Sequence, residues 1–279
     1  MRTDIEVPLA SRLALYTAMA LTIVYSFFPV YWMLVTSVRE PSVLYNTVSL
    51  VPGPFSIENY ATLLAATDYP TWFMNSVYVA TVTVAITLVL AVLIAYAVTR
   101  LRMRGKTTIV GSMLLAYMFP PLLVAIPLYT IFAQLGLANT HFALIVSHCT
   151  ITLPLGVWLL WGFFKQMPAD VEEAAMVDGC SRLGAFFRVV LPLSLPGITT
   201  VAIFSFLLSW TDYTFALVMI DSDYQKTLPV GLETMTGQYE LRDGELMAGS
   251  SLIALPLLVL FIFLNRYFIH GLAAGAIKR

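Results

Sequence analysis

The sequence predicts an all-α membrane protein with six transmembrane helices, cytoplasmic N and C termini, and a cytoplasmic helical elbow between the fourth and fifth spans. Three observations predict this fold class. The chain is 59% hydrophobic and only 11% charged, whereas soluble domains carry about 25% charged residues. Apolar runs of about 20 residues, the length of an α-helix that crosses a bilayer, occur six times. Lysine and arginine are also distributed unevenly among the connections between these runs.

The six predicted spans fill most of the chain. They are Leu13–Val38, Trp72–Val98, Thr108–Gln134, His141–Phe164, Pro196–Ile220 and Met247–Ile269. Because no room remains for a soluble catalytic domain, residues 1–279 are expected to form a single membrane domain. Several spans contain prolines, at Pro29, Pro120, Pro121, Pro127 and Pro154. Neighbouring helices or cavity water satisfy the carbonyls that proline frees, so the kinks favour a protein that opens and closes, although static bundles contain proline too.

The basic residues predict the orientation. If the connections alternate between the two sides of the membrane, twelve of the fifteen lysines and arginines share the side of the two termini. These twelve are Arg2, Arg12, Arg100, Arg102, Arg104, Lys106, Lys165, Arg182, Arg188, Arg266, Lys278 and Arg279. The other side has only Arg39, Lys226 and Arg242. Cytoplasmic connections are enriched in Lys and Arg, so both termini are predicted to be cytoplasmic.

Two sizeable connections are predicted on the outer side. Residues 39–71 are rich in proline and tyrosine, with a short interfacial helix expected around Ser56–Ala65. Residues 221–246 contain six acidic residues, Asp221, Asp223, Glu233, Glu240, Asp243 and Glu245. Either connection is suited to receive a soluble partner outside the membrane, and either is equally explained as a solvated connector.

The motifs that would indicate an enzyme, a nucleotide site or a metal site are incomplete. Gly105-Lys106-Thr107 resembles the end of a phosphate loop, but Arg100 stands where that loop needs its first glycine. The three histidines, His141, His148 and His270, show no metal-ligand spacing. We therefore expect no catalytic residue, no metal and no cofactor in this chain, and an energy source in another subunit.

Between the fourth and fifth spans lies a polar insert, residues 165–192, which we call the elbow. Asp170 followed three residues later by Glu173 predicts a capping box at the start of a short helix. Ala174 and Ala175 favour the helix and allow another backbone to approach closely. Gly179 fits a left-handed C-terminal cap, where a Cβ atom would be strained.

A second short helix is predicted to follow in the elbow. It begins near Ser181, continues through Phe186, Phe187 and Val190, and ends at Pro192. Its aromatic side chains are available to fill a groove on a partner. The alternative is an amphipathic helix that lies beneath the lipid headgroups.

The elbow resembles the signature of the permease subunits of binding-protein-dependent ABC importers. That signature is Glu-Ala-Ala, three residues, Gly, nine residues and Ile-x-Leu-Pro. The chain matches it at Glu173, Ala174, Ala175, Gly179, Leu191 and Pro192, with Asp178 before the glycine and Val189 in place of Ile. Residues 126–129, 135–137 and 266–278 are also similar to carbohydrate importers, in particular the six-helix second permease of maltose- and trehalose-type systems.

The resemblance implies a function and a set of partners. In that family the elbow forms coupling helices that dock into a cleft on a cytoplasmic ABC ATPase dimer, and the partner ATPase binds ATP and Mg. Glu173 would be the chief docking residue, Ala174 and Ala175 would allow close approach, and Gly179 would turn the chain. The further partners would be a homologous second permease, an extracytoplasmic sugar-binding protein and membrane lipid, with no nucleic acid. The location would be the bacterial inner membrane and the cargo a di- or oligosaccharide resembling trehalose or maltose.

A few polar and aromatic residues within the spans are candidates for the substrate path. Asp212 is predicted to lie inside the fifth span, where a charge costs about 2.5–3.5 kcal/mol and should face the bundle interior or a wet cavity. With Trp210 and Tyr213 it would offer a carboxylate and aromatic faces to a sugar. Asn75 and Tyr78 are similar candidates. Polar bonds between helices or to the second permease explain Asp212 and Asn75 as well.

Two other classes of function remain open from the sequence. A proton- or ion-coupled secondary sugar transporter would use Asp212 as its carrier. Such proteins usually contain inverted repeats and several intramembrane charges, and the sequence shows neither. A membrane scaffold or enzyme subunit would use the elbow as a general docking site.

Overall fold

The computed structural model describes residues 9–44, 50–51, 53–238 and 243–276, with side chains up to residue 262. Over these residues the chain is helical, with one isolated antiparallel bridge between Arg39 and Phe55. The predicted all-α class is therefore confirmed. The chain divides into a first unit, residues 1–67 and 235–254, and a second unit, residues 68–234 and 255–279. Five residues used above, Arg2, Glu240, Arg242, Lys278 and Arg279, lie outside the described residues.

The first unit contains α1 (Leu9–Ser37), α2 (Pro41–Leu44) and α3 (Glu58–Ala66). It also includes the end of α13 (Leu228–Gln238) and the start of α14 (Asp243–Ala276). The helix expected around Ser56–Ala65 is α3. Buried Asn59 on α3 donates from Nδ2 to the backbone carbonyls of Ser37 and Arg39, at 3.0 and 2.8 Å. These two bonds fasten α3 to the end of α1.

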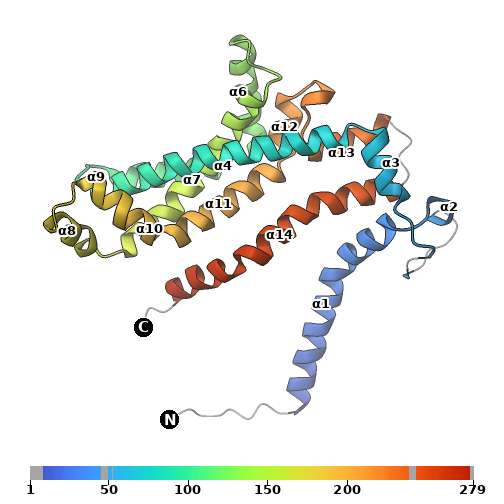
Figure 1. The fold of residues 1–279 in the computed structure, drawn as a ribbon, viewed down its shortest axis with the longest axis horizontal. Helices are drawn as coiled ribbons and strands as arrows, with labels where there is room; N and C mark the ends of the chain where they lie inside the picture. The colour runs from blue at the N-terminus through green and yellow to red at the C-terminus, as the bar shows by residue number, and fades with distance from the viewer. Residues whose placement is uncertain (1–8, 45–49, 52, 239–242, 277–279) are drawn as a thin grey trace. The chain divides into compact units, whose positions relative to one another are not determined.

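Three long helices form the centre of the second unit. They are α4 (Tyr69–Arg100), α7 (His141–Gln166) and α11 (Leu195–Trp210), which pack against one another (Figure 1). Small residues allow the close approach, as is common between membrane helices. A Cβ atom at Gly156 of α7 would lie 2.9 Å from Val201 Cγ1 on α11 and 3.3 Å from Ala91 Cβ on α4. Helix–helix contact here therefore depends on a residue without a side chain.

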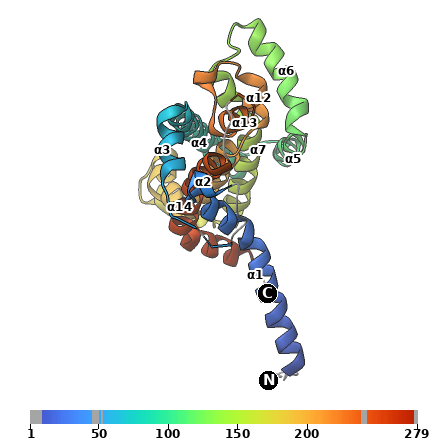
Figure 2. The ribbon, with the colours of Figure 1, turned by 90° about the vertical axis from the view of Figure 1, so that its right-hand side faces the viewer.

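The third predicted span, Thr108–Gln134, is not one helix. It consists of α5 (Lys106–Tyr117) and α6 (Pro121–Gln134), which are bent by 95° at the break between them. Figure 2 shows α5 nearly end-on while α6 runs lengthwise. The cause is the Pro120-Pro121 pair. A residue before proline is excluded from the α region, and Pro120 accordingly has an extended ψ of 130°.

The fifth predicted span, Pro196–Ile220, is also interrupted. Helix α11 ends at Trp210, and α12 (Thr214–Met219) begins after a short break. Asp212 therefore lies in the break and not inside a helix. Its carboxylate accepts hydrogen bonds from the backbone amides of Phe215 and Ala216, at 3.4 and 3.0 Å. Aspartate side chains that bond nearby amides compete with helical bonds and favour helix starts, which explains why a new helix begins here.

Within the described residues, four helices are long and apolar enough to cross a membrane. They are Leu9–Ser37, Tyr69–Arg100, His141–Gln166 and Asp243–Ile262. The number rises to six if each of two bent pairs forms one span. The pairs are α5 with α6, and residues 182–193 with α11, which are bent by 70°. The described part of the chain thus contains four to six candidate spans.

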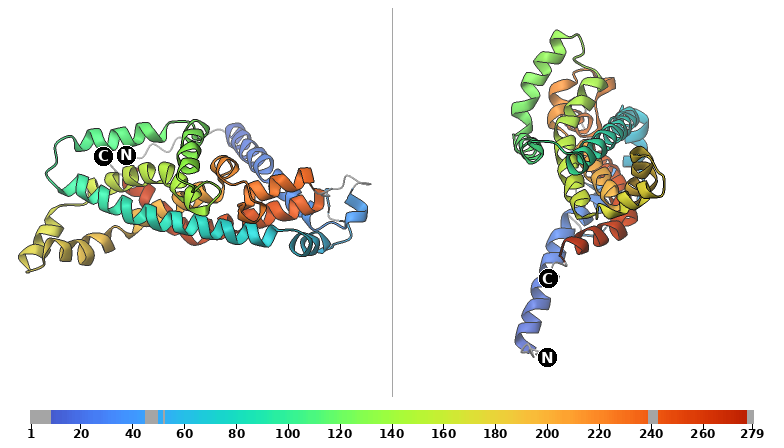
Figure 3. Two further views of the ribbon diagram at one scale, coloured as in Figure 1. Left: turned by 90° about the horizontal axis from the view of Figure 1, so that it is seen from above. Right: turned by 90° about the vertical axis from the view of Figure 1, so that its left-hand side faces the viewer.

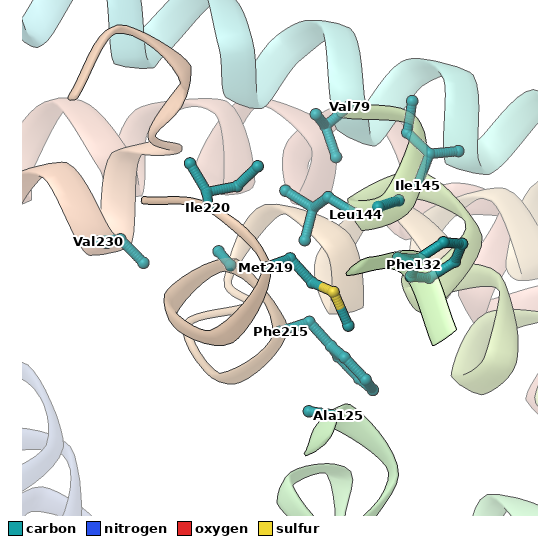
Figure 4. Close-up of a cluster of buried hydrophobic side chains, with 11 residues drawn as sticks. Val79, Ala125, Phe132, Leu144, Ile145, Phe215, Met219, Ile220 and Val230 are labelled. Atoms are coloured by element: carbon teal, nitrogen blue, oxygen red, sulfur yellow. The ribbon is translucent and has the colours of Figure 1, made fainter. Parts of the chain in front are cut away.

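A hydrophobic cluster joins α12 and the start of α13 to the long helices of the second unit (Figure 4). Its labelled members are Val79, Ala125, Phe132, Leu144, Ile145, Phe215, Met219, Ile220 and Val230. The turn from α6 to α7 lies beside it and has positive φ at Gly136 (69°) and Asn139 (57°). A second cluster, around Phe164 of α7, extends to Phe186 and Val190 of the elbow.

Candidate functional site

The elbow lies at the end of the second unit where α4 and α7 finish. It consists of α8 (Asp170–Val177), α9 (Arg182–Ala185), the π-helix η1 (Phe186–Val190) and α10 (Leu191–Leu193). The left panel of Figure 3 shows it as the yellow-brown helices beyond the end of the long teal helix α4. Helix α8 packs on α9 and η1. Two short helices with a turn between them, as predicted, form the elbow.

The start of α8 differs from the predicted capping box. The N-cap residue is Ala169, which has no side chain to cap, and Asp170 is the first helical residue. The backbone amides of Glu172 and Glu173 instead donate to the Ala169 carbonyl, at 3.0 and 3.1 Å. The acids of the first turn still favour the positive end of the helix. Glu173 is exposed, and no side-chain bond caps the start of α8.

The C-terminal end of α8 has the left-handed glycine cap that the sequence predicts. Gly179 has a φ of 92°, which is in the left-handed region. Its amide donates to the Met176 carbonyl at 3.1 Å, and the amide of Cys180 donates to the Ala175 carbonyl at 3.0 Å. This is the two-bond pattern of a Schellman cap. The glycine reverses the chain between the two helices of the elbow.

The second helix of the elbow begins as predicted but ends later. Ser181 Oγ accepts from the Gly184 amide at 3.1 Å, which makes Ser181 its N-cap. Pro192 does not end the helix, which continues to Leu193 and bends at Ser194. Proline lacks an amide hydrogen, and the chain accommodates it at the beginning of α10, directly after the π-helical turn. The Ser194 amide then donates to the Val190 carbonyl at 3.0 Å.

The elbow has an exposed side and a buried side. The exposed side chains include Glu173, Ala174, Val177, Asp178, Leu183 and Phe187, and also the basic Arg182 and Arg188. Phe186 and Val190 are buried in the cluster around Phe164. Of the two predicted groove-filling aromatic residues, only Phe187 is therefore available to a partner. The exposed residues are acidic, basic, small and apolar, and exposed apolar side chains among charged ones are typical of a protein-binding surface.

Glu172, Tyr96 and Arg100 form a buried polar cluster that no motif in the sequence indicates. Its carboxylate accepts a hydrogen bond from the Tyr96 hydroxyl and forms an ion pair with Arg100, with Nε and Oε2 separated by 3.2 Å. The Glu172 side chain is 5% exposed and that of Arg100 is 12% exposed. The residue one step before the predicted docking residue thus binds the chain's own interior.

Asp212 is bound to a histidine 64 residues away in the sequence. His148 Nε2 lies 3.2 Å from Asp212 Oδ2, and His148 Nδ1 lies 2.7 Å from Ser209 Oγ. His148 is buried at 3% exposure. Asp212 therefore ties α7 to the break between α11 and α12. Spacing gave no signal for this pair, because the two residues lie on different helices.

Trp210 and Tyr213 differ in exposure. Trp210 is buried, with its ring stacked on Phe206 at 5.3 Å and edge-on to Phe73 at 5.7 Å between centroids. Tyr213 is exposed on the far side of the break. The structure thus does not gather Trp210, Asp212 and Tyr213 into one exposed patch. Their role in a substrate path stays a prediction.

Asn75 and Tyr78 lie on α4 near the connection between α12 and α13, residues 220–227. Asn75 Nδ2 donates to the carbonyls of Tyr224 and Lys226, each at 2.9 Å. Tyr78 is exposed and its ring lies 5.8 Å from that of His141. Asn75 therefore holds a loop in this structure, and a substrate contact for either residue stays a prediction.

The family of the chain follows from comparison with known proteins. Residues 87–273 match the family model described as binding-protein-dependent transport system inner membrane component. The chain belongs to this family. The matched region contains the whole elbow, the break at Asp212 and most of the second unit. The family is the membrane component of the transporter and not an enzyme, and ATP hydrolysis belongs to a separate subunit. A proton-coupled carrier is not favoured by this membership.

Curated relatives match over almost the full length. The chain is 36% identical over 273 residues to the inner membrane ABC transporter permease protein YcjP of Escherichia coli, covering 96% of this chain and 97% of that protein. It is 34% identical over 274 residues to the trehalose transport system permease protein SugB of Mycobacterium tuberculosis, covering 97% and 100%. It is 32% identical over 270 residues to the trehalose/maltose transport system permease protein MalG of Thermococcus litoralis, covering 96% and 97%.

Solved structures confirm the fold. A chain of a bacterial ABC transporter involved in the import of the acidic polysaccharide alginate superposes with a TM-score of 0.79 at 18% identity. The match covers 94% of this chain and 99% of that one. At this identity the likeness concerns the fold alone. Among the described residues, no group of three His, Cys, Asp or Glu side chains is arranged to hold a metal ion.

Proposed function

We propose that this protein is a permease subunit of an ATP-driven importer for a di- or oligosaccharide, trehalose- or maltose-like. The observation that carries the proposal is the exposed Glu173-Ala174 side of an elbow with a Schellman turn at Gly179, in a chain of the importer family. The cargo is supported by the relatives, which include transport permeases for trehalose, for trehalose and maltose, and for diacetylchitobiose.

The proposed topology has six spans in one membrane domain of residues 1–279, in the bacterial inner membrane. The third span is then the bent pair of α5 and α6, the fifth span is α11 together with α12, and both termini are cytoplasmic. The positive-inside distribution of twelve of fifteen basic residues supports this orientation. It places the elbow in the cytoplasm and the α12–α13 connection on the outer side.

The elbow is the proposed attachment to a cytoplasmic ABC ATPase dimer, which binds ATP and Mg. Glu173 and Asp178 offer carboxylates to basic or amide groups of the ATPase cleft, and Ala174 and Ala175 let its backbone approach. The exposed apolar side chains Val177, Leu183 and Phe187 would lose water-accessible surface on docking, which stabilises the contact. Gly179 turns the chain, and Leu191 and Pro192 lead into the bend before α11.

The transport cycle is alternating access. A second, homologous permease completes the path, and an extracytoplasmic sugar-binding protein delivers the sugar to the outer side. ATP binding closes the ATPase dimer, which pulls the elbow and opens the path outward, and hydrolysis resets the inward-open state. Trp210, Asp212, Tyr213, Asn75 and Tyr78 remain the proposed path residues. Because Trp210 is buried here, its contact with sugar would require the break at Asp212 to open.

The test is ATPase activity and sugar uptake of the complex reconstituted in proteoliposomes with its binding protein, across a panel of disaccharides. We expect stimulation by one α-linked disaccharide. Glu173→Lys should abolish uptake and co-purification of the ATPase, because it reverses the charge at the docking position. Asp221→Lys is the control for co-purification of the ATPase, since Asp221 is also an exposed acid but lies in the α12–α13 connection. Retained co-purification in Glu173→Lys would contradict the proposal.

A further inference from the structure

Two adjacent glutamates of α8 have opposite environments. Glu172 is 4% exposed, whereas Glu173 is exposed. Successive residues of an α-helix are separated by about 100° around its axis, so one acid faces the chain's interior while the next faces away. The outward acid is available to a partner. The inward acid binds the end of α4.

Arg100, the last residue of α4, connects three helix ends. Its Nε lies 3.2 Å from Glu172 Oε2 on α8, and its Nη2 donates to the carbonyl of Met167 at 3.1 Å. Met167 is the C-cap of α7. A guanidinium group presents several donors in a rigid fork, which suits this double attachment in a way that an ammonium group does not. The ends of α4, α7 and α8 therefore meet at one side chain.

Tyr96 lies one helical turn before Arg100, on the same face of α4. Its hydroxyl donates to Glu172 Oε1. Its ring lies 4.6 Å from that of Phe186 in η1 and 6.3 Å from that of Phe164 in α7. Tyr96 and Arg100 together thus contact both helices of the elbow. Glu172 accepts a hydrogen bond from Tyr96 and forms an ion pair with Arg100, so its buried charge is compensated.

The other attachments of α8 are less restrictive. The chain enters α8 from α7 through Pro168 and Ala169, and leaves it through Gly179 in the left-handed conformation. A Cβ atom at Gly179 would meet no other atom within 4 Å, so the turn is not packed against the rest of the second unit. Without the bond from Glu172, α8 would be held by the turns at its ends and by its packing on α9 and η1, with no direct attachment to α4 among the described contacts.

We propose that Glu172 is a positioning residue that, through Arg100 and Tyr96, transmits movement of the elbow to α4. The proposal rests on the proposed function, because it requires the exposed side of α8 to bind the ATPase. Glu173 is then the residue that receives the force, and Glu172 delivers it to a helix of the transport path. Loss of the contacts between Glu172 and α4 should leave the ATPase docked, but ATP would then be hydrolysed with less sugar transported.

The test measures the sugar transported per ATP hydrolysed by the reconstituted complex, together with ATPase co-purification. Glu172→Gln keeps the size of the side chain and removes its charge. We expect normal co-purification and about tenfold less sugar per ATP, the factor that corresponds to about 1.4 kcal/mol. Arg100→Gln should have the same effect. The losses in the double variant should be less than additive, because both substitutions remove the same ion pair, although Arg100→Gln also removes the bond to the Met167 carbonyl.

Asp170→Asn is the matched control. It removes one negative charge from an exposed acid of the same helical turn, so sugar per ATP should be unchanged. If Glu172→Gln lowers co-purification, sugar per ATP is measured in Tyr96→Phe instead. This variant keeps the ion pair and the ring contacts and loses only the hydroxyl. That variant should lower the ratio by a smaller factor.

Three outcomes separate the two proposals. Normal sugar per ATP in Glu172→Gln, or in Tyr96→Phe where the first variant misassembles, overturns the positioning role. Additive losses in the double variant overturn it as well, since they show two independent interactions. Normal co-purification in Glu173→Lys overturns the proposed function instead, and it does so whatever the Glu172 variants show.

Discussion

The two ends of the second unit are fastened in different ways. At one end, the α12–α13 connection is held by neutral side chains that bond its backbone. Trp72 Nε1 donates to the Asp223 carbonyl at 2.7 Å, and Asn75 Nδ2 donates to the carbonyls of Tyr224 and Lys226, each at 2.9 Å. His141 Nε2 lies 2.9 Å from the Gln225 carbonyl oxygen. Ser76 Oγ accepts from the Leu228 amide at 2.8 Å. At the other end, the elbow is bound through the charged cluster at Glu172 and through Phe186 and Val190, which are buried around Phe164.

This difference indicates how each end responds to change. Neutral bonds spread over several carbonyls define one loop conformation, and the loss of any one leaves the others in place. A buried ion pair depends on both partners, because removal of one leaves the other charge uncompensated. We therefore expect substitutions at the α12–α13 connection to lower stability, and substitutions at the elbow to lower coupling.

The largest expected effect on stability is that of Gly231→Ala, which lies where α13 begins to pack on α4. A Cβ atom there would overlap the indole ring of Trp72. Overpacking of this kind costs about 3 kcal/mol, and it would displace the indole that bonds Asp223 O. Thermal unfolding of the purified complex should show the loss. Gly111→Ala is the control, since a Cβ atom there meets nothing within 4 Å.

Asp212→Ala tests the region between the two ends. It removes the partner of buried His148 and the acceptor for the first amides of α12, so we expect a loss of about 1–3 kcal/mol in stability. Asp212→Asn retains a hydrogen-bonding side chain and should cost less. If Asp212 contacts sugar, the Asn variant will raise the half-saturating sugar concentration at unchanged thermal stability. Equal stability of the Ala variant and the native protein would contradict the structural role.

Asn75→Ala sharpens the comparison at the α12–α13 connection. The loss of two bonds to backbone carbonyls should destabilise the loop by about 1–2 kcal/mol. Hydrogen exchange of amides 221–227 should become faster by about tenfold, which corresponds to about 1.4 kcal/mol. Tyr78→Phe, one turn further along α4, should leave that exchange unchanged. Unaltered exchange in Asn75→Ala would show that the remaining bonds suffice.

Gly179→Ala tests the elbow, with an expected effect on stability no larger than that of Asn75→Ala. The left-handed φ of 92° costs an alanine about 1–2 kcal/mol, with no steric overlap. We expect a small decrease in thermal stability and a clear decrease in sugar transported per ATP. A variant that loses stability but keeps the ratio would contradict the assignment of coupling to the elbow.

Some features were predictable because their causes are local. The cap at Gly179 follows from the preference of left-handed positions for glycine, and the N-cap at Ser181 follows from its hydroxyl. The break at Pro120-Pro121 has a signal in the sequence, although only the structure shows that the two halves diverge by 95°. The prediction that the second elbow helix ends at Pro192 was wrong. A π-helical turn precedes Pro192, and the helix continues to Leu193.

Other features depend on residues far apart in the chain. The bond between His148 and Asp212 joins positions 64 residues apart, and no spacing rule connects them. Helix α11 ends before Asp212 because that carboxylate caps α12 and bonds His148 instead of lying inside a span. An apolar run of the right length does not reveal such a break.

The sequence by itself determined the membrane class, the importer family and the place of the elbow, because composition, charge distribution and a spaced motif are properties of the chain alone. Only the tertiary structure decided which of two adjacent glutamates turns inward. Glu172 and Glu173 are chemically identical, and either suits the first turn of a helix. The choice depends on the direction in which α8 lies against Tyr96 and Arg100, more than 70 residues earlier in the chain. Packing sets that direction, and local preference does not.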